Sequence, residues 1–207
     1  MNVEIETGPG VLVPRSETEL LGYAALDLIA DVEKPIVVDM CCGSGNLALA
    51  IAVARPAARV SGSDLTREAV TAARANIVRL GLQAQVEVHQ GDMFEGLAGL
   101  GLQGIVDLVV CNPPYISTAK LESDKAYLLN SEPREAFDAG PYGIAIHLRL
   151  VAEAIPYLRR GGWIAFEFGT GQERQAKALL ARSQAYSSAR FFQNAEGAPR
   201  VAIASKL

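Results

Sequence analysis

The chain has 207 residues, of which half are apolar and a fifth are charged, a composition typical of a globular protein with one sizeable core. Its net charge of −4 disfavours a stand-alone nucleic-acid binder, because such proteins need a broad basic surface. The sequence shows no basic-then-apolar leader and no apolar run of ~18 residues, so we expect neither secretion nor membrane insertion. The three cysteines, Cys41, Cys42 and Cys111, form no disulfide pattern, which predicts a reducing, cytoplasmic compartment.

Residues 2–14 are predicted to form a short hairpin or an extended arm. Gly8-Pro9-Gly10 is a turn signal, and residues 11–13 would form the second strand of the hairpin. Ser16, with Glu19 three residues later, has the spacing of a capping box. Apolar residues at helical spacing over 20–29 then predict a helix that follows this cap.

From residue 36 onwards, strand and helix patterns alternate, which predicts a doubly wound, mostly parallel α/β sheet of seven strands. We expect the fourth strand beside the first, and the last two strands as an antiparallel hairpin at the sheet edge. The predicted strands cover residues 36–38, 58–63, 86–88, 105–111, 163–168, 189–193 and 200–204. The predicted helices in this part cover residues 47–54, 67–80, 144–158 and 172–183.

The turn after the first strand reads D-M-C-C-G-S-G-N over residues 39–46. A glycine-rich turn between a first strand and its helix is where doubly wound sheets bind nucleotide-like ligands. Gly43 and Gly45 would let the backbone approach such a ligand and adopt a positive φ. Because Ala48 fits the relaxed dinucleotide pattern, this turn alone does not exclude a dinucleotide.

Two further acids follow strands, Asp64 after the second and Asp92 after the third. Each one alone could equally cap a helix N-terminus. A carboxylate can also accept hydrogen bonds from ribose hydroxyls or from an exocyclic amine. Acids at three consecutive strand ends, together with the glycine-rich turn, favour a ligand that contains an adenine and a ribose.

The segment Asn112-Pro113-Pro114-Tyr115 follows the fourth strand and should therefore lie beside this ligand. A planar NH₂ group could donate one hydrogen to the Asn112 side-chain oxygen and the other to the Pro113 carbonyl. That would position its nitrogen and favour the partly positive nitrogen of a transition state in which the nitrogen attacks an electrophile. The prolines would stiffen the loop and Tyr115 would stack on the flat group. The alternative interpretation is a plain turn that ends a strand.

The glycine-rich turn, Asp64 and Asp92 together resemble the class I methyltransferases, which have a Rossmann-like fold and use S-adenosylmethionine, releasing S-adenosylhomocysteine. The resemblance implies that residues 41–45 line the methionine part, that Asp64 holds the ribose, and that Asp92 with Met93 holds the adenine. The family turn has glycine where this chain has Cys41, and we expect a cysteine there only with negative φ. The predicted cofactor-binding residues are Asp39, Cys41, Cys42, Gly43, Ser44, Gly45, Asn46, Asp64, Leu65, Asp92, Met93 and Asn112.

A longer set of motifs, in order along most of the chain, is similar to the PrmC/HemK family. These are residues 11–19, the loop 112–115, residues 132–137 with Gly140, residues 161–163, and Glu167-x-Gly169-x-x-Gln172. That family methylates the side-chain amide of a glutamine in the Gly-Gly-Gln motif of peptide-chain release factors. The resemblance implies that Asn112, Pro113, Pro114 and Tyr115 are catalytic, and that Arg15, Thr18, Glu19 and Tyr115 bind the substrate.

Members of that family carry an N-terminal helical docking domain, where this sequence has about ten residues. We therefore expect an N-terminal hairpin and helix over residues 1–30 and a methyltransferase domain over 31–207. The predicted substrate is a release factor. The alternatives are a small metabolite with an amide, guanidine or amine, a nucleic-acid base, or no substrate, if the chain is an inactive partner subunit. We expect no metal, and a monomer or a homodimer.

Overall fold

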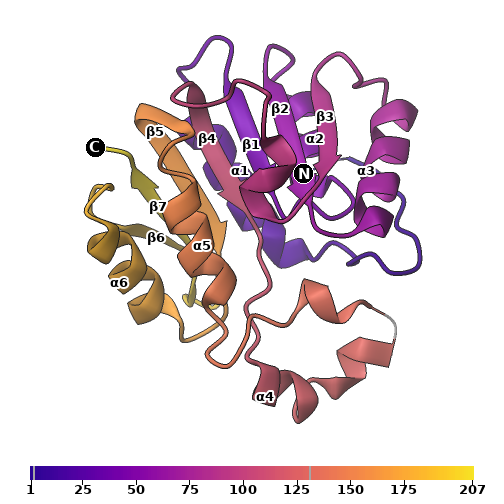
Figure 1. The fold of residues 1–207 in the computed structure, drawn as a ribbon, viewed down its shortest axis with the longest axis vertical. Coiled ribbons are helices and arrows are strands. Elements are labelled where there is room, and N and C mark those ends of the chain that lie inside the picture. Colours follow the sequence, from indigo (N-terminus) through magenta and orange to yellow (C-terminus); the bar gives the residue numbers. More distant parts are fainter. Residues whose placement is uncertain (2, 131) are drawn as a thin grey trace.

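A seven-stranded sheet crosses the computed structural model, which describes residues 1, 3–130 and 132–207 (Figure 1). The strand order is β3-β2-β1-β4-β5-β7-β6. Strands β1 to β5 are parallel, and β7 runs antiparallel to both β5 and β6. The predicted doubly wound sheet and its terminal hairpin are therefore confirmed. The strands are β1 (Ile36–Met40), β2 (Arg59–Asp64), β3 (Val86–Gln90), β4 (Val106–Cys111), β5 (Leu158–Glu167), β6 (Arg190–Gln193) and β7 (Pro199–Ser205).

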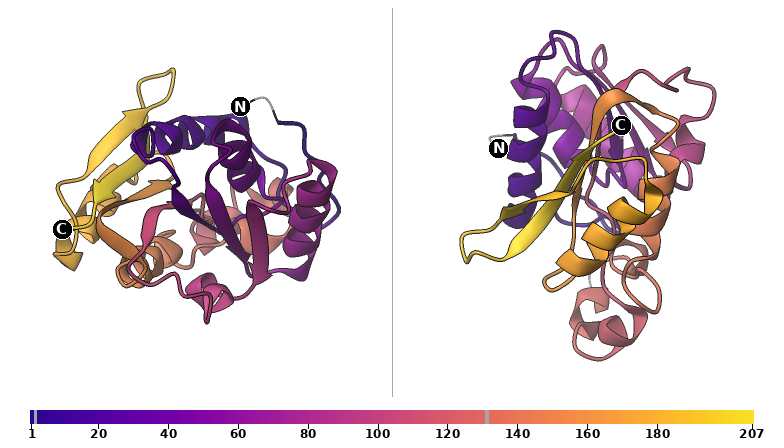
Figure 2. Two further views of the ribbon diagram at one scale, coloured as in Figure 1. Left: turned by 90° about the horizontal axis from the view of Figure 1, so that it is seen from above. Right: turned by 90° about the vertical axis from the view of Figure 1, so that its left-hand side faces the viewer.

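Helices cover both faces of the sheet (Figure 2). One face packs against α1 (Glu19–Leu28), α2 (Asn46–Ala54) and α3 (Arg67–Arg79), and the other against α5 (Ala145–Glu153) and α6 (Glu173–Ser183). Because both faces are covered, the central strand β4 is apolar at five of its six positions and buried along its whole length. In the described part of the chain, 3₁₀ turns also occur at Ser16–Thr18, Met93–Leu97, Ala126–Asn130 and Arg134–Ala136.

The strand register brings three functional segments to one edge of the sheet. Met40, the last residue of β1, pairs with Ser63 of β2 and with Cys111 of β4. The glycine-rich turn, the Asp64 segment and the Asn112 loop therefore leave the sheet side by side, as the predicted topology requires.

The N-terminal segment is an extended arm, which is one of the two predicted forms, and the alternative, a hairpin, is wrong. The described residues 3–14 belong to no strand, although the turn at Gly8 is present; residue 2, also part of the prediction, lies outside the described residues. The arm pairs with a side chain instead. The Glu6 amide donates to Asn76 Oδ1 at 2.8 Å, and Asn76 Nδ2 donates to the Glu6 carbonyl at 2.8 Å. A buried amide on α3 thus takes the role that a second strand would have had.

The helix after the arm starts differently from the prediction. Ser16 does not form the predicted capping box; its hydroxyl bonds to Glu17, and the N-cap of α1 is Thr18. Helix α1 packs against α2, and its residues Leu21, Ala24 and Ala25 are part of the core. The division of the chain at residue 30 stays a prediction.

A long segment between β4 and α5 projects from the sheet edge and carries the short helix α4 (Thr118–Glu122), at the bottom of Figure 1. Within it, Arg134 forms ion pairs with Glu122 and Asp138. Glu132 accepts a hydrogen bond from the Val13 amide at 2.9 Å and pairs with Arg15. The segment is therefore tied to the N-terminal arm across the mouth of the site. Among the described residues, no helix is long and apolar enough to cross a membrane.

Candidate active site

The turn after β1 adopts the backbone conformation that its glycines allow. Gly43 has φ 54° and Gly45 has φ 84°. Cys41 also has a positive φ, 57°, so the expectation of negative φ at this position is wrong. A side chain in this left-handed conformation costs roughly 1–2 kcal/mol. The turn thus keeps the conformation that suits glycine even where the chain has cysteine.

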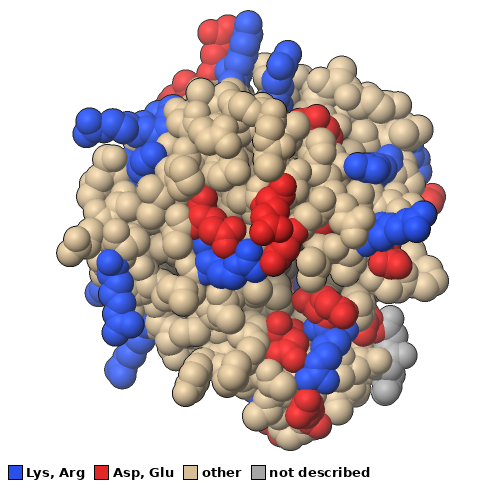
Figure 3. Space-filling view, viewed as in Figure 1, with Lys and Arg blue, Asp and Glu red and all other residues tan. Residues whose placement is uncertain are grey.

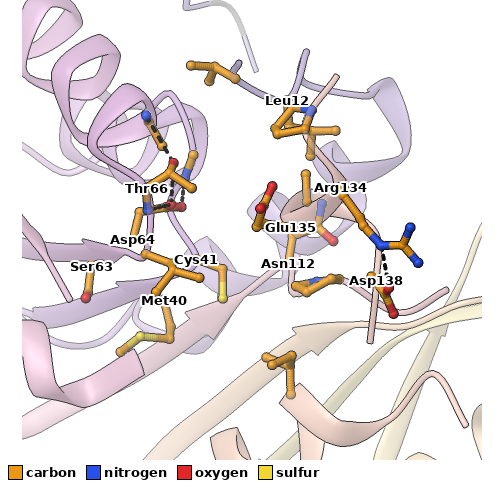
Figure 4. Close-up of a pocket in the computed structure, with 18 of the residues that line it drawn as sticks. Leu12, Met40, Cys41, Ser63, Asp64, Thr66, Asn112, Arg134, Glu135 and Asp138 are labelled. Atoms are coloured by element: carbon orange, nitrogen blue, oxygen red, sulfur yellow. Dashed lines mark hydrogen bonds and ion pairs between the residues drawn. The ribbon is translucent and has the colours of Figure 1, made fainter. Parts of the chain in front are cut away.

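A cavity of about 340 Å³ opens beside this turn, within the range of small-molecule sites. Figure 4 shows Cys41 and Asp64 on one side of it and Asn112 and Glu135 on the other. Of the predicted cofactor residues, seven line it: Cys41, Gly43, Asp64, Leu65, Asp92, Met93 and Asn112. The arm and the long segment contribute Gly10 to Leu12 and Pro133 to Ala136. Their own composition does not signal a ligand, although both lie in motifs that carry the family resemblance.

Asp64 faces this cavity and is not the helix cap. Its Oδ2 accepts from the Gly43 amide at 2.9 Å, and its Oδ1 accepts from the Thr66 amide at 3.0 Å. The cap of α3 is Thr66, whose hydroxyl accepts from the Ala69 amide. The Thr66 hydroxyl also donates to Oδ1, at 3.2 Å. The carboxylate is therefore held in place by three donors, and Oδ2, which has one donor, keeps an acceptor site for a ligand hydroxyl.

Asp92 is held differently from the expectation of a simple acceptor. Arg149 of α5 donates to both of its oxygens, at 2.8 and 2.9 Å. The pair is half exposed at the cavity rim, and one lone-pair direction on each oxygen remains for a ligand amine. Met93, with φ 52°, is buried beside it, and its sulfur lies 3.9 Å from the sulfur of Cys41.

Four more of the predicted cofactor residues line a small cavity of about 20 Å³ at the turn: Asp39, Cys42, Ser44 and Asn46. Gly45 lines neither this small cavity nor the cavity of about 340 Å³; a side chain there would meet Leu49 and Ala73. Asp39 Oδ2 accepts from the Ala48 amide at 2.9 Å, whereas Oδ1 and the Ser44 hydroxyl have no partner among the described residues. Burial, together with the charge of Asp64, raises the pKa of Asp39 to about 7. Unpartnered polar atoms beside the larger cavity fit the polar end of an amino-acid-like ligand.

The Asn-Pro-Pro-Tyr loop forms the wall between two cavities. Asn112 lines both of them, Pro114 faces the first cavity, and Pro113 and Tyr115 face a second large cavity of about 450 Å³. A group bound in the second cavity would thus meet the first at Asn112. This placement favours a functional loop over a plain strand-ending turn.

The side chains of this loop are fixed from behind. Asn112 Nδ2 donates to Thr18 Oγ1 at 2.9 Å, and Tyr115 donates to Glu167 at 3.2 Å. Burial first, and then the nearby charge of Glu167, raise the pKa of Tyr115 to about 12. The phenol therefore stays neutral at physiological pH and is not a base.

The predicted substrate residues separate into three places. Arg15 lines the second large cavity together with Tyr115. Thr18 is buried behind Asn112, with 2% of its surface exposed. Glu19 pairs with the N-terminal amine of Met1, away from both large cavities. Sequence reasoning missed Glu167 and Arg200 as members of this site, although Glu167 lies in the recognised Glu-x-Gly motif.

Charges around the site are mixed. On the face seen in Figure 3, acidic and basic side chains alternate and no broad basic field is present. The three cysteines are free. Within the described ranges, no cluster of three or more His, Cys, Asp or Glu side chains is placed to hold a metal ion.

Comparison with known proteins gives the following matches. Residues 23–140 match the family model of the methyltransferase small domain. The release factor glutamine methyltransferase of Moorella thermoacetica is 37% identical over 204 residues, which covers 99% of this chain and 70% of that protein.

Solved structures of methyltransferases share the fold. The catalytic domain of hMettl16, in complex with the MAT2A 3′UTR hairpin 6, superposes with a TM-score of 0.74 at 15% identity, over 98% of this chain and 75% of that chain. A release-factor-specific protein-(glutamine-N5) methyltransferase from Alicyclobacillus acidocaldarius gives 0.56 at 22% identity, over 97% and 98%. At these identities the likeness concerns the fold alone.

Proposed function

Since this chain belongs to the release factor glutamine methyltransferase family, we propose that it methylates the side-chain amide nitrogen of a glutamine in a peptide-chain release factor. It is an S-adenosylmethionine-dependent N-methyltransferase of class I fold. The observation that supports transfer of a group between two bound molecules is the position of Asn112, which lines both the cavity of about 340 Å³, the proposed cofactor cavity, and the second large cavity.

The cofactor cavity has the donors and acceptors that S-adenosylmethionine needs. Asp64 would accept from the ribose hydroxyls and Asp92 from the adenine amine, while Asp39 and Ser44 would bind the polar end of the methionine part. When bound, the cofactor supplies an electrophilic methyl group on a sulfonium. All the predicted cofactor-binding residues other than Gly45, which packs against α2 and α3, keep this role in the proposal.

The residues of the chain then orient the nucleophile. In this proposal the Asn112 side-chain oxygen and the Pro113 carbonyl each accept one hydrogen of the substrate amide. The nitrogen is thereby aimed across the loop towards the cofactor cavity, and its developing positive charge is stabilised by two acceptors. Tyr115, neutral and held by Glu167, provides a flat surface for the amide plane. Arg15 borders the same cavity, where it would contact the flanking peptide.

Incubation with labelled S-adenosylmethionine and a release factor tests the proposal. We expect label on the glutamine of the Gly-Gly-Gln motif, located by mass spectrometry of the digested release factor. Asn112→Ala should lower kcat by about 10²–10³-fold, the typical effect of removing one such group, with a much smaller loss of cofactor affinity, because Asn112 also lines the cofactor cavity. Cofactor binding without transfer to the release factor, or transfer only to small amides or amines, would contradict the proposed substrate.

A further inference from the structure

A buried carboxylate lies behind the catalytic loop and connects both of its polar side chains. Glu167, the last residue of β5, is 2% exposed. Its Oε2 accepts from Thr18 Oγ1 at 3.0 Å. Its Oε1 accepts from the Tyr115 hydroxyl at 3.2 Å and from Arg200 Nη2 at 3.3 Å. Donors from three distant parts of the chain therefore converge on one side chain.

Burial raises the pKa of Glu167, and the three donors oppose this effect and favour the charged form. A carboxylate accepting several hydrogen bonds, one of them from a guanidinium, is stabilised as an anion. Arg200 is itself largely buried, with 14% of its side chain exposed, and a second bond ties it to the Phe168 carbonyl at 2.9 Å. The ion pair is thus held rigidly at the end of the central strands.

The charge on Glu167 fixes the direction of the hydrogen bonds that follow. A carboxylate can only accept, so the single hydroxyl proton of Thr18 points to Glu167. The oxygen of Thr18 can then only accept from Asn112, which lies 2.9 Å away through Nδ2. An amide whose NH₂ group faces Thr18 presents its oxygen on the opposite side, and the network itself determines this orientation. Asn112 therefore offers an acceptor, not a donor, where the cavities meet.

We infer that Thr18 and Glu167 are positioning residues, which hold the Asn112 amide with its oxygen towards the substrate nitrogen. The inference rests on the proposed function, because the acceptor matters only if the substrate group carries hydrogens. Without the Thr18 acceptor, the Asn112 amide can rotate by half a turn. Its NH₂ group would then face the NH₂ group of the substrate amide, and no hydrogen bond could form between them. Thr18, expected from the sequence to contact substrate, acts from behind the loop instead.

Two substitutions at position 18 separate a polar role from a packing role. Thr18→Val keeps the shape and removes the hydroxyl, whereas Thr18→Ser keeps the hydroxyl and removes the methyl group. With release factor as substrate, we expect Thr18→Val to lower kcat about 10–100-fold, with KM for the release factor and cofactor affinity within about 2-fold. Thr18→Ser should stay within about 3-fold of the unmodified protein. The reverse order, with Ser impaired and Val active, would show a packing role and overturn the inference.

Glu167→Gln tests the direction of the chain of hydrogen bonds. The amide oxygen of the new side chain can still accept from Tyr115 and Arg200, while its NH₂ donates to Thr18. The Thr18 hydroxyl is then free to donate to Asn112, whose oxygen turns away from the substrate. We expect a fall in kcat similar to that of Thr18→Val. An unchanged kcat in a folded Glu167→Gln protein would contradict the assigned direction.

A measurement without substrate keeps this inference separate from the proposed function. The side-chain ¹H–¹⁵N signals of Asn112, assigned by their loss in Asn112→Asp, report directly on the bond to Thr18. In Thr18→Val these signals should shift and exchange faster with water, whereas in Thr18→Ser they should stay close to their original positions. Absence of release-factor methylation with this NMR pattern would reject the function alone. Identical Asn112 signals in Thr18→Val and the unmodified protein would reject the positioning role.

Discussion

Asp39 is fully buried, and in the described part of the chain only one of its two carboxylate oxygens has a hydrogen-bond partner. Its ionised form therefore lowers the stability of the cofactor-free protein. Only Oδ2 has a partner, the Ala48 amide, among the described residues. Burial raises its pKa to about 7, and the charge of Asp64 adds to the effect. Between its ordinary pKa and this value the folded state binds more protons at Asp39 than the unfolded state does. Its contribution to stability therefore falls as the pH rises through that window.

Asp39→Asn removes this contribution. We expect the free energy of unfolding of the variant, relative to that of the unmodified protein, to increase from pH 4 to pH 8 by up to about 4 kcal/mol. Urea titrations of both cofactor-free proteins at several pH values measure the difference, and other titrating groups, including the buried His147, are common to both. A difference that is constant with pH, or that grows towards acid, would contradict the raised pKa. Cofactor affinity should fall in the same variant, because an acceptor for the methionine part is lost.

Cys41 shows where residue-level prediction reached its limit. The residue types alone predicted where the glycine-rich turn lies, since its position follows from the strand before it and the helix after it. The left-handed φ of Cys41 was not predictable from a residue that rarely adopts it. The turn is determined by Gly43, Gly45 and the Asp64 carboxylate that binds the Gly43 amide, and Cys41 follows.

At the scale of elements, Gln172 joins three loops around Tyr115. Its Nε2 donates to the Tyr115 carbonyl at 3.0 Å and to the Gly143 carbonyl at 3.1 Å, and its Oε1 accepts from the Gly169 amide at 2.8 Å. The segments after β4, before α5 and after β5 are thereby held together. The Glu-x-Gly-x-x-Gln motif supplies both this connection and the Glu167 carboxylate.

Gly169 leaves no room for a side chain in this arrangement. A Cβ there would lie 2.9 Å from Gln172 Oε1 and 3.1 Å from Tyr115 Cδ2. We expect Gly169→Ala to move the Tyr115 ring and to lower kcat at least about 10-fold, with cofactor affinity unchanged, since such small misplacements of a site cost heavily. Steady-state methylation assays and cofactor titrations measure both quantities.

Gly171→Ala is the matched control in the same loop. Its Cβ would meet nothing within 4 Å, but its φ is +86°. It should therefore lose roughly 1–2 kcal/mol of stability and keep its kcat. Equal kcat values for the two variants would show that the space beside Tyr115 is not limiting.

The alternating elements could be predicted because each strand or helix buries its own apolar pattern, and the neighbouring positions of β1 and β4 follow from topology rules. The attachment of the N-terminal arm could not be predicted, since the partner of its backbone is the Asn76 side chain, 70 positions away from Glu6. Helix α4 also lacked a periodic signal, because it has five residues and buries only Leu121. The three acids at or near the ends of β1, β2 and β3 lie at the predicted edge of the sheet. The contact between Thr18 and Glu167 could not be predicted, because these residues are 149 positions apart in the sequence.

At the scale of the whole molecule, the arm completes the cofactor cavity and depends on Asn76. This amide is buried on α3 and also donates to the Ser44 carbonyl at 3.1 Å. It therefore connects the arm, α3 and the glycine-rich turn. Gly10, Val11 and Leu12 of the arm form part of the cavity wall.

Asn76→Asp should release the arm, because an acceptor then faces the Glu6 and Ser44 carbonyls. We expect a loss of about 2–3 kcal/mol in stability, faster proteolytic cleavage within residues 3–14, and a several-fold weaker affinity for S-adenosylmethionine. Limited proteolysis and calorimetry measure these effects. Asn194→Asp is the control, since the Asn194 Oδ1 accepts from the Ala198 amide and a carboxylate preserves that bond. An arm that stays resistant to protease in Asn76→Asp would contradict its dependence on this amide.

The wall formed by the Asn112 loop has a kinetic consequence. Among the described residues, the cofactor cavity and the second large cavity share only Leu12, Asn112 and Ala136 as lining residues, so the two ligands would occupy largely separate cavities. We therefore expect spent cofactor to leave, and a fresh molecule to enter, while the polypeptide stays docked. The two reactants should then bind in random order, and the residence time of the protein substrate should not limit the exchange of the nucleoside.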